Sequence, residues 1–233
     1  MFKRHLEVLK KVSVFLQTKY KQEWAFGGGT ALSLFFWQHR FSEDLDFFLF
    51  GPEPFLKKLA SKELIRVFEQ ETGLLLLEKR FPGHVLTFII KVETFPIKVQ
   101  FFDEQKVAPL LSETIGNLLV YVEPPEGIIA RKIFWKEETF RSRDIFDIAC
   151  YIEKEGLQKL FSIIPADKFL TFLKNFEEKV KEKGFIDSYQ KELTSLNVFK
   201  TNKKLDPEYC LNLFQKEFRK YLFQKRSIKG PQI

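Results

Sequence analysis

The stretch GGGTALSLFFWQHRFSEDLDFF, residues 27–48, sets three glycines and a threonine before one apolar run and two acidic residues before another. Neither a hydrophobic core nor a solvated surface requires that order. The glycines permit positive φ and close backbone approach, and Thr30 lies where a helix can begin. Free N–H groups would then converge on one point, which suits a phosphate, although glycines also form ordinary turns.

Asp44 and Asp46 stand two residues apart at the head of the apolar string that ends this stretch. Side chains two apart on a strand point to the same face, so both carboxylates would project together. Burying two like charges without compensation is costly, and a divalent cation such as Mg²⁺ removes that cost. The alternative is that both acids are exposed at the start of the strand and cap the turn after Ser42.

The flanking sequence alternates between helical and strand patterns as far as Pro124. We expect helices at 4–19, at 30–38 and within 53–71, and strands at 44–50, 74–80, 84–92, 97–102 and 118–123. The string ETFP at 93–96 predicts a hairpin. From Pro124 on, apolar residues recur at helical spacing. The sequence therefore predicts an α+β protein with a small mixed, twisted sheet in residues 1–124 and an α-helical domain in residues 125–233.

Composition excludes several classes of protein. The 233 residues are 45% hydrophobic and include 28 phenylalanines, so a packed core is expected and overall disorder is not. The two cysteines, Cys150 and Cys210, form no CxxC or Cys/His cluster, which argues against a disulfide framework or a structural zinc site. The charged N-terminal segment indicates an amphipathic helix rather than a signal peptide. We expect a soluble, cytoplasmic protein without a membrane partner.

The net charge of +7 is unevenly distributed. Residues 1–155 hold 22 Lys and Arg and 22 Asp and Glu, whereas residues 156–233 hold 16 against 9. A basic segment beside a neutral body is typical of a protein that binds a polyanion such as RNA. Solvated lysines on helix surfaces give the same excess without any ligand.

Residues 27–48 resemble the first motif of a nucleotidyltransferase family that includes the AbiEii and AbiGii toxins of abortive-infection and toxin–antitoxin systems. That motif is a GGTAL-like helix start followed by R-x-S-x-DLDF. Gly28–Leu32 and Arg40–Phe47 carry its two parts here.

A second family motif is a lysine on a helix, followed about three turns later by an Arg-Asp pair and another Asp three residues on. Residues 127–152 carry it as Lys132, Arg143, Asp144 and Asp147. Lys132 can neutralise phosphate charge, and the two aspartates share one helix face. The alternative is an exposed salt-bridge lattice on these helices, formed by Arg131, Lys136, Glu137, Arg141 and Asp144.

The resemblance implies a polymerase-β-like nucleotidyltransferase core followed by a helical domain. It implies that Asp44 and Asp46 bind Mg²⁺ or Mn²⁺, and that Lys132 and Asp144 complete the catalytic set. The implied nucleotide-binding residues are Gly28, Gly29, Thr30, Arg40, Ser42, Lys132 and Asp147. The implied reaction moves a nucleoside monophosphate from a nucleoside triphosphate to an acceptor hydroxyl. The expected acceptor is RNA, such as the acceptor end of tRNA, and the expected partner is an antitoxin protein.

One position departs from the family pattern. Nucleotidyltransferases of this fold usually carry a third carboxylate in a string of the form I-K-V-D/E, and the string PIKVQFFD puts Gln100 there. Glutamine cannot accept a proton. Glu93 or Asp103 substitutes, the acceptor is activated in another way, or catalysis is lost. Two other functions therefore stay open: a degenerate nucleotide- or RNA-binding module, and a nucleotidyltransferase acting on protein or small molecules.

Overall fold

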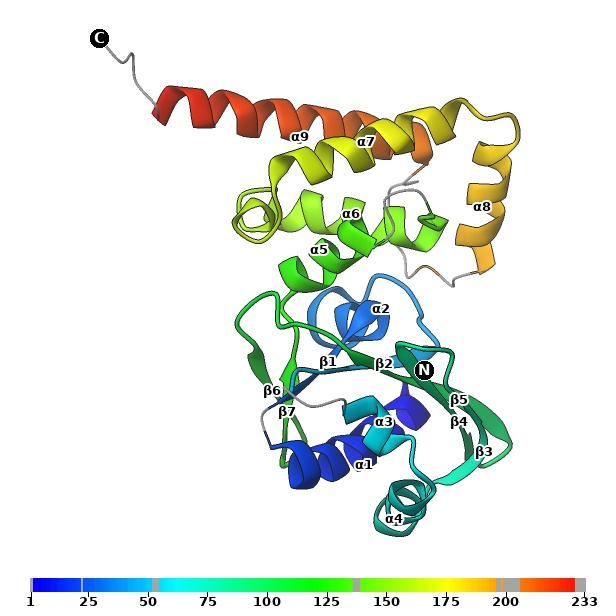
Figure 1. Ribbon diagram of the computed structural model, residues 1–233. Coiled ribbons are helices and arrows are strands. Elements are labelled where there is room, and N and C mark those ends of the chain that lie inside the picture. Colours follow the sequence, from blue (N-terminus) through cyan, green and yellow to red (C-terminus); the bar gives the residue numbers. More distant parts are fainter. Residues whose placement is uncertain are drawn as a thin grey trace. The chain divides into compact units, whose positions relative to one another are not determined.

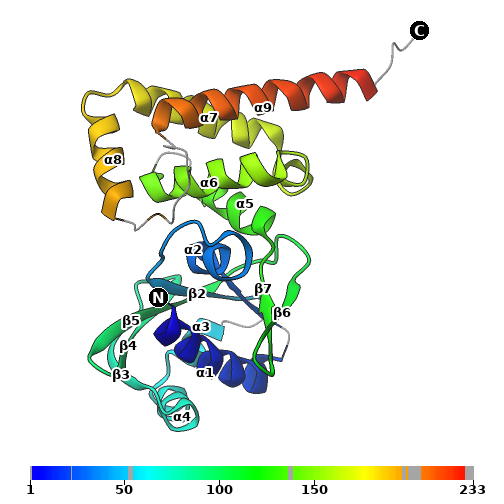
Figure 2. The same cartoon turned by 180° about the vertical axis from the view of Figure 1, so that it is seen from behind.

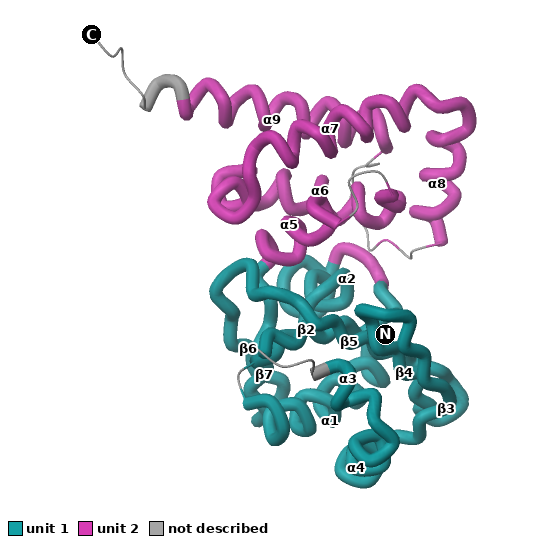
Figure 3. Tube along the Cα trace, in the orientation of Figure 1, with its two compact units in different colours: residues 1–38, 42–124 teal, residues 39–41, 125–233 magenta. Residues whose placement is uncertain are grey.

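The computed structural model describes residues 2–21, 23–51, 55–135, 139–195, 198 and 206–228. The chain divides into two compact units (Figure 3). The first unit holds residues 1–38 and 42–124, and the second holds residues 39–41 and 125–233. The polypeptide therefore leaves the first unit after Gln38 and re-enters it at Ser42.

The described part of the first unit forms one seven-stranded mixed sheet, in the order β3-β4-β5-β2-β1-β7-β6. The pairs β2–β5 and β1–β7 are parallel, and the other pairs are antiparallel. The strands are β1 (Trp24–Gly27), β2 (Asp44–Leu49), β3 (Leu75–Arg80), β4 (Val85–Val92), β5 (Phe95–Asp103), β6 (Leu111–Ile115) and β7 (Leu118–Val122).

Helices lie on both sides of this sheet. Figures 1 and 2 show α1, α3 and α4 on one side and α2 on the other. Their bounds are α1 (Lys3–Tyr20), α2 (Gly28–Ala31), which continues as the π-helix η1 (Leu32–Trp37), α3 (Phe55–Leu59) and α4 (Lys62–Thr72).

Phenylalanine rings link the sheet to α1 and α4. Phe15 contacts Phe68 edge to face, and Phe68 contacts Phe88 in the same way. Phe88 packs against Phe101, which stacks on Phe47 with ring centroids 5.6 Å apart. All five rings are buried, and each contributes roughly 1.5–3 kcal/mol of hydrophobic stabilisation. The odd-numbered residues of β2 thus face the core, which leaves Asp44 and Asp46 together on the opposite face.

The strands and helices expected in residues 1–124 are present, and the hairpin expected at 93–96 joins β4 to β5. Two strands were not predicted. β1 has only four residues, all buried, so it shows no alternation of polar and apolar positions. β6 is a short edge strand with polar residues at its centre. The helix expected at 30–38 begins two residues earlier, at Gly28.

The second unit contains the helices α5 (Pro125–Trp135), α6 (Ser142–Glu155), α7 (Ala166–Lys181), α8 (Phe185–Ser195) and α9 (Pro207–Ile228), with a short 3₁₀ turn η2 (Leu160–Ser162). Phe169, Phe172 and Phe176 recur at helical spacing on α7 and contact Phe214 of α9. These rings form the core between the two helices. Among the described residues, no helix combines the length and apolarity that a membrane crossing requires.

Candidate active site

The predicted site residues fall into two groups, one in each unit. The first unit holds the glycine turn and the strand carboxylates: Gly28, Gly29, Thr30, Ser42, Asp44 and Asp46. The second unit holds the ionic residues: Arg40, Lys132, Asp144 and Asp147.

Asp44 and Asp46 begin β2 and lie beside β5 in a parallel register. Asp44 is paired with Lys98, and Asp46 is paired with Gln100. Residues paired in this way project from the same face of the sheet, so the two carboxylates, Lys98 and Gln100 share one face. Lys98 Nζ lies 3.0 Å from Asp44 Oδ2. Both carboxylates are half-buried.

The backbone of Gly28 lies against the side chain of Asp46. It has a φ of +69°, a conformation that disfavours residues with a side chain. A Cβ at this position would lie 2.0 Å from Asp46 Oδ2. The backbone at Gly28 therefore passes directly beside the Asp46 carboxylate and leaves no space for a side chain at position 28. Of the three glycines at 27–29, only Gly28 uses a positive φ.

Thr30 and Ser42 lie at the two ends of the segment between the glycine turn and β2. Thr30 is fully buried, and its hydroxyl donates a hydrogen bond to the backbone oxygen of Asp44. This bond fixes α2 against the first residue of β2. Ser42 is half-buried and lies two residues before that strand.

In the second unit, Lys132 of α5 and Asp144 of α6 form a close ion pair. Lys132 Nζ lies 2.6 Å from Asp144 Oδ1, and the lysine is only 12% exposed. Asp144 Oδ2 accepts a hydrogen bond from the backbone N–H of Arg141, at the start of α6. Asp144 therefore both caps its own helix and holds the ammonium group of Lys132.

Asp147, one turn further along α6, is the centre of the same ionic cluster. Arg40 binds it with two nitrogens: Nε lies 2.7 Å from Oδ1, and Nη2 lies 2.7 Å from Oδ2. His39 Nε2 is 2.7 Å from Oδ1, and Lys132 Nζ is 3.2 Å from Oδ2. Asp147 is fully buried, and Arg40 is 2% exposed. The segment 39–41 is thus fixed to α6 by a two-pronged ion pair.

The charges of this cluster are mutually stabilised. Burial raises the pKa of Asp147, but Arg40 and Lys132 outweigh that effect and hold its pKa well below the ordinary value. Burial lowers the pKa of Lys132, but Asp144 and Asp147 outweigh it, so its pKa is raised. Burial lowers the pKa of His39, and its bond to Asp147 reverses this only in part. His39 is therefore a neutral imidazole at pH 7, with Nε2–H donating to the carboxylate.

This geometry contradicts the exposed-lattice alternative. Asp144 is fully buried and paired with Lys132, and Arg131 is also buried. Lys136 and Glu137, the other members of that lattice, lie outside the described residues.

The structure places neither proposed substitute for a third carboxylate beside Asp46. Glu93 lies in the β4–β5 turn, where its Oε2 is 2.8 Å from a guanidinium nitrogen of Arg4. Asp103 ends β5 opposite Leu49 and lies three residues from Gln100, so its side chain projects from the other face of that strand.

Three residues of these clusters were not singled out as site residues from the sequence. His39 carries no sequence signal, because the three histidines of the chain are scattered and form no motif. Lys98 occurs in the string used to locate Gln100 but carries no signal of its own. Glu123 follows β7 and is 1% exposed, with Oε2 only 2.6 Å from where a Cβ of Gly27 would lie. A single acid ending the apolar run LLVYV is its only sequence signal.

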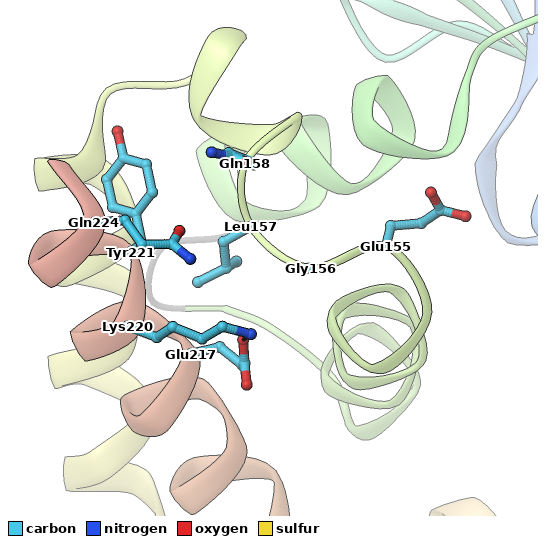
Figure 4. A pocket seen from close by; sticks show the side chains of 8 residues that line it. All are labelled: Glu155, Gly156, Leu157, Gln158, Glu217, Lys220, Tyr221 and Gln224. Carbon is cyan, nitrogen blue, oxygen red and sulfur yellow. Dashed lines mark hydrogen bonds and ion pairs between the residues drawn. The ribbon is translucent and has the colours of Figure 1, made fainter. Parts of the chain in front are cut away.

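Two further observations limit what the site contains. Within the described ranges, no group of three or more His, Cys, Asp or Glu side chains is arranged to hold a metal ion. A pocket of about 170 Å³ lies in the second unit, lined by Glu155 at the end of α6, by the following residues 156–158, and by Glu217, Lys220, Tyr221 and Gln224 of α9 (Figure 4). It contains none of the predicted site residues.

The sheet and its helices are those of nucleotidyltransferase-like proteins. JHP933 from Helicobacter pylori is 17% identical to this chain, with a TM-score of 0.59 over 99% of this chain and 96% of its own. A nucleotidyltransferase toxin from Mycobacterium tuberculosis, MenT4, is 16% identical, with a TM-score of 0.50 over 92% and 82%. These likenesses show the fold. No curated protein sequence matches the chain.

The family follows from the sequence profile described as "Nucleotidyl transferase AbiEii toxin, Type IV TA system", which matches residues 13–223. The match spans most of the chain. The protein therefore belongs to the AbiEii nucleotidyltransferase toxin family, and the resemblance seen in the two sequence motifs is confirmed.

Proposed function

We propose that this toxin is a metal-dependent enzyme that transfers a nucleoside monophosphate from a nucleoside triphosphate to RNA, with tRNA as the first acceptor to test. An antitoxin protein would neutralise it, in keeping with the toxin–antitoxin description of its family. One observation carries the proposal: Asp44 and Asp46 share one face of β2, with the Gly28 backbone directly beside Asp46.

The residues at this face fit a Mg²⁺ or Mn²⁺ ion. Two carboxylates two residues apart on one strand provide oxygen ligands, and Mg²⁺ in phosphate sites usually takes one or two carboxylates with water and substrate oxygens. Because Gly28 has no side chain, its backbone can lie directly beside the Asp46 carboxylate. When bound there, the ion would polarise the α-phosphate and neutralise charge on the pyrophosphate leaving group.

The chain's own groups would bind and orient the nucleotide. In our proposal the backbone N–H groups of Gly28 and Gly29 and the hydroxyl of Ser42 donate to phosphate oxygens. Thr30 holds this turn against β2 through its bond to the Asp44 backbone oxygen. The acceptor hydroxyl attacks the α-phosphorus, the bond to the β-phosphate oxygen breaks, and pyrophosphate leaves. The hydroxyl proton passes to solvent water, because Gln100 beside Asp46 cannot accept it.

Lys132 would act as an oriented cation. Its ammonium group has three N–H donors, and the carboxylates of Asp144 and Asp147 account for two of them. We infer that the third donates to a phosphate oxygen. The family resemblance implies that Arg40 and Asp147 bind the nucleotide. They are turned toward each other and buried, so we propose that they act by holding Lys132 in place.

The basic charge of residues 156–233 supports RNA as the acceptor. Neutralising several phosphates is the main source of affinity for a nucleic acid, and an excess of lysine on exposed helices provides it. Lys216 and Arg219 of α9 are exposed members of this set.

The test is to incubate the purified protein with Mg²⁺, each α-labelled nucleoside triphosphate in turn and total tRNA, beside Asp46→Ala. Label should enter RNA with the wild type and not with the variant. Label in protein or in a small molecule would support transferase activity but would show that RNA is not the acceptor.

The neutral Gln100 beside Asp46 favours a second candidate, a nucleotide- or RNA-binding module without turnover. Nucleotide binding that depends on metal, with no label in RNA, protein or small molecules, would establish that module and contradict transfer.

A further inference from the structure

Lys98 is a cation already positioned at the carboxylate pair. It lies on β5 directly opposite Asp44, with its Nζ 3.0 Å from Asp44 Oδ2. It projects from the same face as Gln100, two residues on, and therefore from the same face as Asp46. No role was assigned to it from the sequence.

The Lys98–Asp44 contact is easily exchanged. Lys98 is 39% exposed and Asp44 is 21% exposed, so water screens their attraction. Lysine has a long flexible side chain with three rotatable N–H donors, which lets the ammonium group reach a new acceptor without moving the backbone. A divalent ion binds a carboxylate oxygen directly and carries twice the charge of an ammonium group, so it would displace Lys98 from Asp44.

The charge balance of this face indicates what the displaced lysine can bind. Asp44 and Asp46 contribute two negative charges, and Gln100 contributes none where a third carboxylate would stand. With one divalent ion bound, a site with two carboxylates has a less negative net charge than a site with three. A bound triphosphate then carries negative charge that one such ion does not neutralise, and a lysine on the same face can neutralise part of it.

We propose that Lys98 exchanges partners during nucleotide binding: it neutralises Asp44 in the free protein and binds a phosphate oxygen when the metal–nucleotide complex takes its place. This inference rests on the proposed function of the Asp44 and Asp46 site. Lys98 thereby supplies charge compensation that a second metal ion provides in two-metal sites.

The competing explanation is a cross-strand ion pair that serves only the β2–β5 register. Such a pair would affect folding but would not affect metal and nucleotide affinity in opposite directions. That difference makes the two explanations separable.

The experiment measures binding without turnover. The affinity for Mn²⁺ alone, and for the Mn²⁺ complex of a non-hydrolysable nucleoside triphosphate, is determined for wild type, Lys98→Met and Lys98→Arg. Lys91→Met is the matched control, because Lys91 is exposed on the same face of the sheet, one strand away. Thermal melting of each variant confirms that it is folded.

Lys98→Met should bind Mn²⁺ alone about two- to fivefold more tightly, because Asp44 has lost its competing cation. It should bind the metal–nucleotide complex at least about tenfold more weakly, because a charge-assisted hydrogen bond is lost. Lys98→Arg should recover most of the nucleotide affinity, and Lys91→Met should match wild type.

Affinities that stay unchanged, or that shift in the same direction for both ligands, would overturn the exchange. A different outcome would contradict the proposed function alone: wild type binds both ligands, Lys98→Met shows the opposite shifts, and wild type transfers no nucleotide. The exchange would then still stand.

Discussion

Gly28 is the residue at which one added atom would change the site most. Its backbone lies so close to Asp46 that a Cβ would overlap the carboxylate oxygen. The sequence shows three adjacent glycines and cannot distinguish them, because the difference arises from how β1 and β2 are paired. Gly27 is extended at the end of β1, and only Gly28 adopts positive φ.

We predict that Gly28→Ala abolishes Mn²⁺ binding at the Asp44 and Asp46 face, because the new methyl group must displace the Asp46 carboxylate. Gly83→Ala is the matched control: Gly83 also has positive φ, but nothing lies within 4 Å of its added Cβ. Both variants should lose roughly 1–2 kcal/mol of stability from the backbone conformation. Equal Mn²⁺ affinity in the two variants, measured by calorimetry, would contradict the assigned geometry.

His39 gives the second unit a predictable response to acid. Its pKa is lowered in the folded protein, so the unfolded chain binds a proton more readily. Its contribution to stability is therefore complete above the ordinary histidine pKa of 6.5 and is lost as the pH falls toward the lower folded-state value. Urea midpoints should fall between pH 7 and pH 5 in wild type and fall less in His39→Gln. The exposed His84→Gln should keep the wild-type slope; a slope unchanged in His39→Gln would refute the assignment.

At the scale of elements, the segment 39–41 is the feature that pattern analysis could not assign. The helix before it and the strand after it were predicted, and the structure has both. The segment itself belongs to the second unit, because Arg40 and His39 bind Asp147 on α6. The sequence marks Arg40 as part of a motif with Asp44 and Asp46, but a partner more than 100 residues away leaves no local pattern.

We predict that Asp147→Asn lowers the free energy of unfolding by about 3–5 kcal/mol, because it leaves the buried Arg40 guanidinium without its counter-charge. Asp187→Asn, at an exposed position on α8, should change it by less than about 0.5 kcal/mol. Urea unfolding measures both values. Equal values for the two variants would show that the Arg40–Asp147 pair does not support the second unit.

At the scale of the whole molecule, the two units divide the predicted residues between a carboxylate face and a buried ionic cluster. Sequence patterns predicted the α+β class, most strands of the sheet and the family, because period-two and helical spacings and the two motifs are local signals. They did not predict β1, the pairing of Asp44 with Lys98, or the burial of Asp147, because each depends on strand register or on packing between distant segments.

The charge of the second unit leads to a prediction about RNA. Replacing Lys216 and Arg219 with glutamate should weaken tRNA binding and reduce its dependence on salt, because two phosphate contacts are lost. The same charge change at Lys57 and Lys58, exposed on α3 of the first unit, is the control. Filter binding over a range of salt concentrations measures both. An equal loss in the two double variants would indicate a general charge effect rather than an RNA-binding surface.

The most direct test of the central claim is the rate of nucleotidyl transfer to RNA by Asp46→Asn compared with Asp103→Asn. Both changes remove one carboxylate charge from the first unit, but only Asp46 lies against Gly28, on the face of β2 that also carries Asp44. We predict that Asp46→Asn lowers the rate at least about 100-fold and that Asp103→Asn leaves it close to wild type. Equal rates for Asp46→Asn and wild type would show that the Asp44 and Asp46 face is not the site of transfer.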